Sequence, residues 1–89
     1  MVLQAFEVLR QHELVIIRRL RGGPLTEFEL AREVAENSNW SAQDSFEHIK
    51  EWLDHLQKEG LVWAGKLYND KGQHIYAAAL TRRGKEIIR

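Results

Sequence analysis

Histidine and carboxylate side chains at helical spacing are the residues of this chain best suited to chemistry. His48, Glu51 and His55 are separated by three and four positions. On an α-helix this spacing places all three on one exposed face, where they could ligate a divalent metal. The alternative is a solvated polar face that includes two imidazoles by chance. The sequence favours this alternative because it supplies no obvious fourth ligand or supporting partner, so we expect neither a metal site nor a cofactor.

Other sequence features that accompany catalysis are missing. The chain has no nucleotide-binding glycine loop, no nucleophile elbow and no metalloprotease helix motif. It has no cysteine, which excludes disulfides and thiolate metal sites and fits a reducing compartment. No stretch approaches the roughly 20 apolar residues that span a membrane, and the first ten residues lack the basic start of a signal peptide. We therefore expect a cytoplasmic protein without catalytic residues.

The distribution of charge is more informative than its total. The 89 residues predict one domain over 1–89, and their formal net charge is zero. Residues 1–25 carry +2, residues 26–59 carry −6 and residues 60–89 carry +4. Acidic groups are therefore concentrated in the centre and basic groups in the flanks. A nucleic-acid-binding protein normally presents a basic face, so any such face would have to come from the flanks.

Residues 2–21 are predicted to form the first helix, and its apolar surface is wider than a single stripe. Two explanations are open: the helix is buried on two sides by its own domain, or its beginning packs against another subunit. A small domain has little core to spare, which favours the second explanation. The predicted dimer interface combines apolar residues from both ends of the chain, Val2, Leu3, Phe6, Leu9, Ile87 and Ile88.

Two further helices have clear start signals. Gly22-Gly23-Pro24 ends the first helix, and Thr26 with Glu29 forms a capping-box pattern for a helix to about Glu36. After a turn over residues 37–40, Ser41 and Asp44 begin a third helix that Gly60 ends.

The third helix has the clearest periodicity in the chain. Its apolar stripe predicts that Phe46 and Leu53 belong to the core. Trp52 and Trp63 are expected to close the edge of the core between this helix and the following strands. Trp40, in the turn, is either a packing anchor or a contact for a partner.

Two apolar strands are predicted after the third helix, over residues 61–68 and 75–80, joined by a polar turn over 69–74. Thr81 then caps a short final helix that carries Ile87 and Ile88. The predicted fold class is mainly α with a small β-hairpin (α+β): a three-helix core, a hairpin and a short C-terminal helix.

Four segments carry a family resemblance: Gly22–Ala31, the helix end at Leu53–Val62, the hairpin turn Asn69–Gly72 and the closing segment Leu80–Ile88. In this order they resemble the winged helix-turn-helix domain of MarR-type and PadR-type transcriptional regulators, over nearly the whole chain. The resemblance implies a homodimer that binds double-stranded DNA. In that fold the third helix enters the major groove and the hairpin, or wing, lies against the neighbouring backbone.

Seven residues are candidates for DNA contact. Base readout is assigned to Ser41, Gln43 and His48 on the third helix. The hairpin contributes the remaining four, Lys66, Lys71, Gln73 and His74. The outward positions at the start of the third helix carry no lysine or arginine; they are Gln43, Asp44, Glu47, His48 and Glu51. The alternative function is therefore a protein-interaction module that docks through its acidic third helix.

Overall fold

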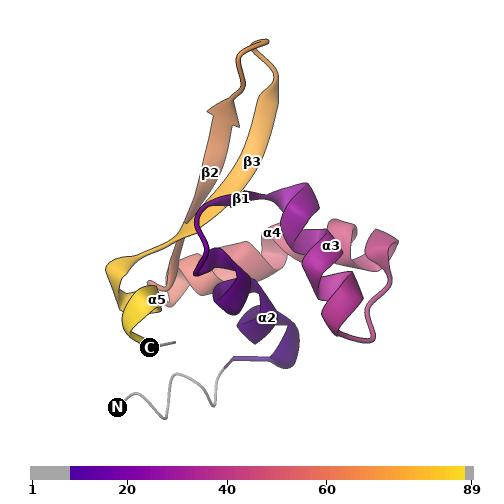
Figure 1. Cartoon of the computed structure of the whole chain (residues 1–89), viewed down its shortest axis with the longest axis vertical. Helices are drawn as coiled ribbons and strands as arrows, with labels where there is room; N and C mark the ends of the chain where they lie inside the picture. Colours follow the sequence, from indigo (N-terminus) through magenta and orange to yellow (C-terminus); the bar gives the residue numbers. More distant parts are fainter. Residues whose placement is uncertain (1–8, 88–89) are drawn as a thin grey trace.

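The computed structural model describes residues 9–87, which form four helices and a three-stranded antiparallel sheet (Figure 1). The α+β class predicted from the sequence is confirmed. No helix in the described part of the chain is long and apolar enough to cross a membrane. In order, the elements are α2 (Gln11–Leu20), β1 (Leu25–Thr26), α3 (Glu27–Asn37), α4 (Ala42–Lys58), β2 (Val62–Tyr68), β3 (His74–Leu80) and α5 (Arg82–Ile87).

The prediction of one continuous helix over residues 2–21 is wrong. Arg10 is extended, with φ −81° and ψ 162°, and α2 begins only at Gln11. The cause is local: the side chain of Glu13 turns back and its Oε1 accepts a hydrogen bond from the backbone N–H of Arg10, at 3.1 Å. In a continuous helix this amide would donate to a carbonyl of the preceding turn, and here the Glu13 side chain is its partner instead. Val2, Leu3, Phe6 and Ile88 lie outside the described residues.

The start signals of the next two helices are confirmed. The side chain of Thr26 accepts from the backbone N–H of Glu29 at 3.3 Å, and Glu29 Oε1 accepts from the backbone N–H of Thr26 at 3.1 Å. Ser41 Oγ accepts from the backbone N–H of Asp44 at 3.0 Å. At the other end of α4, Gly60 has φ +75°, a conformation that favours glycine after a helix.

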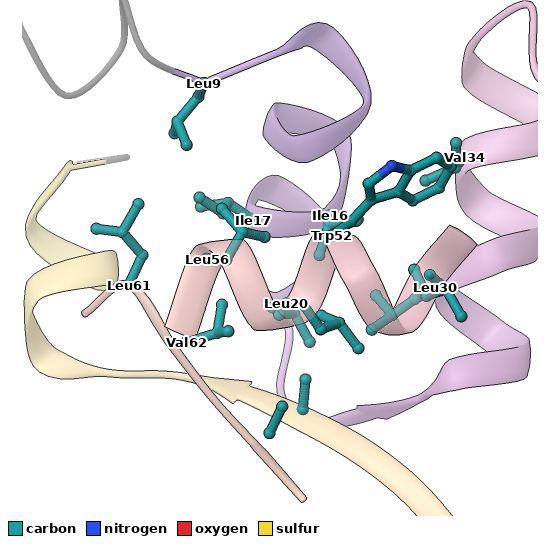
Figure 2. Close-up of a cluster of buried hydrophobic side chains, with 14 of the residues drawn as sticks. Leu9, Ile16, Ile17, Leu20, Leu30, Val34, Trp52, Leu56, Leu61 and Val62 are labelled. Carbon is teal, nitrogen blue, oxygen red and sulfur yellow. The ribbon is translucent and has the colours of Figure 1, made fainter. Parts of the chain in front are cut away.

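The core lies where α2, α3, α4 and the base of the hairpin meet (Figure 2). Leu53 is fully buried in α4, and Trp52 is 7% exposed, as predicted. The cluster contains residues from every helix; its largest fully buried apolar members are Ile16, Ile17, Leu30, Ile49, Leu53, Leu56 and Leu61.

Two aromatic residues assigned to the core are exposed instead. Phe46 is 43% exposed and Trp63 is 50% exposed. The buried face of α4 is centred on Ile49, Leu53 and Leu56, so Phe46 falls at the rim of the apolar stripe, where the exposed ring of Phe28 lies against it. Trp63 alternates with the buried Val62 and Ala64 along β2 and therefore points to the opposite side of the sheet.

The sheet has the order β1-β3-β2, so β3 is the central strand. The predicted hairpin is present, with Val62 opposite Leu80 and Tyr68 opposite His74. Strand β1 was not predicted: Leu25 and Thr26 pair with Ala78 and Ala77 of β3. Because β1 leads directly into α3, this pairing fixes the start of α3 against the hairpin.

The final helix is held at the base of the hairpin. The hydroxyl of Thr81 accepts from the backbone N–H of Gly84 at 3.1 Å, which confirms its predicted capping role, and donates to the carbonyl oxygen of Gly60 at 2.6 Å. Gly84 is buried so closely against Leu61 that an added Cβ would lie 2.1 Å from the Leu61 carbonyl oxygen. Helix α5 therefore packs directly on the backbone between α4 and β2.

Candidate nucleic-acid interface

The exposed surface of α4 has two flanks that lie on different sides of the helix. At 100° per residue, Gln43, Phe46, Glu47 and Lys50 share one side, which we call the hairpin flank. The other exposed side, the pocket flank, contains Asp44, His48, Glu51 and His55. The two flanks have different neighbours.

Three contacts place the hairpin flank beside the sheet and the start of α3. Lys50 Nζ lies 5.5 Å from the centre of the Tyr76 ring on β3. The same nitrogen is 3.9 Å from Glu27 Oε2, at the first residue of α3. The Phe46 ring stacks on the Phe28 ring, with centroids 5.0 Å apart. The hairpin flank and the face of β3 that carries Tyr76 therefore border the same surface of the molecule.

Of the residues predicted to read bases, Ser41 and Gln43 lie at the N-terminal end of α4 and are exposed. Ser41 is engaged as the helix cap. Gln43 Nε2 donates to Glu47 Oε1 at 3.4 Å, which leaves its second amide hydrogen and its oxygen free for another partner. Gln43 is therefore the predicted readout residue with unused hydrogen-bonding capacity.

The structure places His48 away from the hairpin, on the pocket flank. Its Nδ1 donates to the Asp44 carbonyl oxygen at 2.8 Å. Its ring lies 5.3 Å from that of Trp40 and 6.0 Å from that of Trp52. Trp40 thus serves as a packing anchor, one of the two roles expected for it. His48 belongs to this aromatic cluster and is not brought together with Gln43.

A pocket of about 440 Å³ opens beside this cluster, between α2 and α4. Its floor includes Glu13, which is 2% exposed and accepts a hydrogen bond from Nδ1 of His55. His48, Glu51 and His55 all border the pocket. However, no group of three histidine or acidic side chains within residues 9–87 is arranged to hold a metal ion. Of the three residues with this spacing, His55 instead links α4 to α2 through its hydrogen bond to Glu13.

His12, in the same pocket, is 6% exposed, and its ring lies 4.3 Å from that of Trp52. Burial lowers the pKa of His12 below 6.5; Glu13 opposes this shift, whereas Arg10 and His48 add to it. The unfolded chain therefore binds a proton here at a higher pH than the folded protein does. Well above pH 6.5 neither state is protonated at this site, so the site does not reduce the free energy of unfolding. As the pH drops through 6.5, the unfolded chain takes up the proton first, and the free energy of unfolding falls.

We expect His12→Gln to reduce the loss of stability between neutral and mildly acidic pH. Urea denaturation at pH 7.5 and 5.5, for the wild type and the variant, measures the difference. His74→Gln is the matched control, because His74 is exposed on the hairpin. A variant with the same pH dependence as the wild type would contradict the assignment to His12.

Three of the predicted hairpin residues, Lys71, Gln73 and His74, lie at the turn of the hairpin, and Lys66 lies within β2, opposite Tyr76. Lys66, Lys71, Gln73 and His74 are all exposed. Asn69 organises the turn: its Oδ1 accepts from the backbone N–H groups of Lys71 and Gln73, each at 2.9 Å. The His74 ring packs edge-on against Tyr68 at 4.7 Å. This tip projects away from the helices (Figure 1), and Lys71 lies in its turn.

Lys50 was missed as a candidate in the sequence. It lies between Phe46 and Asp54 on the side of α4 that faces the sheet, and its side chain is 61% exposed. The sequence does indicate that Lys50 shares a helix face with Gln43: Phe46, Glu47 and Lys50 follow Gln43 by three, four and seven positions. This spacing could not be used without knowing on which side of α4 the hairpin lies.

Two residues of the predicted dimer interface are buried in the core of their own chain. Leu9 is 7% exposed and Ile87 is 8% exposed, and both belong to the core cluster. They therefore present little apolar surface to a second subunit.

A known structure shares this arrangement. A candidate transcriptional regulator from Thermoplasma acidophilum matches it with a TM-score of 0.64, over 86% of this chain and 75% of that one, with 22% sequence identity. The likeness shows that the two proteins share a fold. No protein-family model matches the sequence, and no curated protein is significantly similar to it.

Proposed function

We propose that this protein is a DNA-binding transcriptional regulator with a winged helix-turn-helix fold. Helices α3 and α4 would be the helix-turn-helix, and β2 and β3 the wing. The observation that carries the proposal is that Lys50 on α4 contacts Tyr76 on β3, because the exposed flank of α4 and the hairpin then border one surface. The regulator-like fold of the Thermoplasma acidophilum protein supports it.

In this proposal α4 enters the major groove and the wing lies on the DNA backbone. Ser41 and Gln43 are at the end of α4 that such helices direct at base edges. Lys50 replaces His48 among the α4 residues proposed to contact DNA, because the His48 ring is packed against tryptophans. On the wing, Lys66 and Lys71 supply charge for phosphates, and Gln73 and His74 supply hydrogen bonds.

The proposal includes a homodimer. Two copies would present two recognition helices to a site with two halves, as DNA-binding dimers of this type do. With Leu9 and Ile87 in the core, the apolar residues proposed for the subunit contact are Val2, Leu3, Phe6 and Ile88. Two chains of 10.4 kDa are therefore expected for each bound duplex.

The test is titration of a random-sequence DNA duplex at 50 and 200 mM salt. Lys71→Ala should weaken binding to every duplex and reduce the slope of log affinity against log salt by about 0.9, the value for one lost phosphate contact. Glu47→Gln should strengthen non-specific binding, because it removes a negative charge beside Gln43.

Lys58→Ala is the matched control: Lys58 ends α4 and pairs with Asp54 at 3.0 Å, away from the tip of the wing. Equal losses from Lys71→Ala and Lys58→Ala would contradict the role of the wing. Sedimentation of the complex would show whether two chains bind.

A second candidate function is a protein-interaction module. The observation that favours it is the pair of exposed, stacked rings of Phe28 and Phe46, because exposed apolar clusters often mark protein contacts. Glu47 follows Phe46 on the same flank of α4, and its carboxylate would suit a basic partner. This function predicts no duplex binding by the wild type even at 50 mM salt.

A further inference from the structure

Phe46 on the hairpin flank stacks on Phe28 of α3, and both rings are exposed. Phe28 is 62% exposed and Phe46 is 43% exposed. Their rings are nearly parallel, at 19°, so each limits the motion of the other. Neither contributes to the core, so their apolar surface is available to a ligand.

Gln43 lies one helical turn before Phe46 on the same flank. Three residues advance an α-helix by about 4.5 Å, close to the roughly 3.4 Å between stacked base pairs. Gln43 and Phe46 are therefore spaced to meet neighbouring base pairs if α4 lies in a major groove. Glu47 accepts one amide hydrogen of Gln43 at 3.4 Å and leaves the other hydrogen and the amide oxygen for a base.

The chemistry of both side chains matches one kind of base pair. A glutamine amide with a free hydrogen and a free oxygen can bond to N7 and the N6 amino group of adenine. A phenylalanine ring offers no hydrogen bond, but it makes apolar contact with the methyl group of thymine. Cytosine and guanine lack that methyl group.

We propose that Gln43 and Phe46 recognise neighbouring A·T base pairs, with Phe28 supporting the Phe46 ring against a thymine methyl group. This inference rests on the proposed function, because it requires α4 to lie in the major groove. Beyond DNA binding, the inference predicts a preference for A·T base pairs and attributes it in part to the apolar contact made by Phe46.

The experiment removes the methyl group from the DNA. Duplexes bound by the wild type are selected from a random pool, and the strongest is then made with thymine or with uracil, which lacks only the 5-methyl group. We expect the selected duplexes to be rich in A·T pairs. Uracil should weaken wild-type binding about four-fold for each methyl group contacted, the value for one buried carbon.

Variants assign the effect to Phe46. Phe46→Ala should bind the thymine duplex as weakly as the wild type binds the uracil duplex, and it should not distinguish the two. Leu67→Ala is the control, because Leu67 is 46% exposed and lies on the hairpin away from α4. It should retain the preference for thymine.

The outcomes separate the two proposals. Equal wild-type affinity for thymine and uracil duplexes would overturn this inference and leave DNA binding intact. A thymine preference that persists in Phe46→Ala would overturn the assignment to Phe46. No binding to any duplex at 50 mM salt would overturn the proposed function and this inference with it.

Discussion

Leu53→Ala is expected to lower the free energy of unfolding by about 2–5 kcal/mol, the range for truncating a buried leucine. Leu53 is fully buried in the middle of α4. Its removal would leave a cavity among side chains from several elements, which cannot all move inward to fill it. Small domains have a total stability of roughly 5–15 kcal/mol, so this one change could remove a large part of it.

Chemical denaturation followed by circular dichroism measures the effect. Leu67→Ala is the matched control, because the same truncation at an exposed position of β2 should cost no more than about 1 kcal/mol. Similar losses for the two variants would mean that the buried face of α4 has been assigned incorrectly.

Gly84→Ala is expected to be strongly destabilising, although alanine is the better helix former. In an exposed helix the change would stabilise by about 1 kcal/mol. Here the new Cβ would lie 2.1 Å from the carbonyl oxygen of Leu61 and 3.0 Å from a methyl group of Leu80. The oxygen belongs to the backbone and cannot rotate away, so α5 must shift from the base of the hairpin. Overpacking of this kind typically costs about 1–3 kcal/mol.

Close packing predicts that Gly84→Ala lowers the stability, whereas helix propensity alone predicts that it raises the stability. Gly22→Ala is the control, because the nearest atoms to a Cβ there are at ordinary contact distances of 3.5 Å and more. Thermal unfolding should show a lower midpoint for Gly84→Ala and a nearly unchanged one for Gly22→Ala. A raised midpoint for Gly84→Ala would contradict the close packing of α5.

The parts of the fold that could be predicted from the sequence are those with local causes. The caps at Thr26 and Ser41 depend on a side chain and an amide three residues away, and both were identified correctly. The hairpin was identified because apolar strands flank a turn with Asn69 and Gly72. In each example the residues that determine the structure are close together in the chain.

The errors concern features that depend on distant parts of the chain. Periodicity placed Phe46 on the apolar stripe, but only the positions of the neighbouring helices decide where the core ends. The two residues of β1 are too few to form a pattern, and their pairing with β3 depends on the whole intervening chain. The start of α2 was missed because arginine at position 10 is not a usual cap residue.

The candidate site divides in the same way. The exposure of Gln43 and the position of Lys71 in a turn followed from local pattern. The separation of His48 from Gln43 also follows from helical spacing, although the prediction grouped the two residues, whereas which flank of α4 faces the sheet could not be read from the sequence. Lys50 gained its significance only from the contact with Tyr76.

The pairing of β1 with β3 also determines the order in which the structure can assemble. Leu25 and Ala78 are about fifty residues apart, whereas α3 with α4, and β2 with β3, are neighbours in the chain. Bringing distant segments together costs chain entropy, which only later contacts repay. The helix pair and the hairpin, which already meet where α4 leads into β2, can therefore form before β1 closes onto β3. The attachment of the start of α3 to the sheet is then the contact expected to form late in folding.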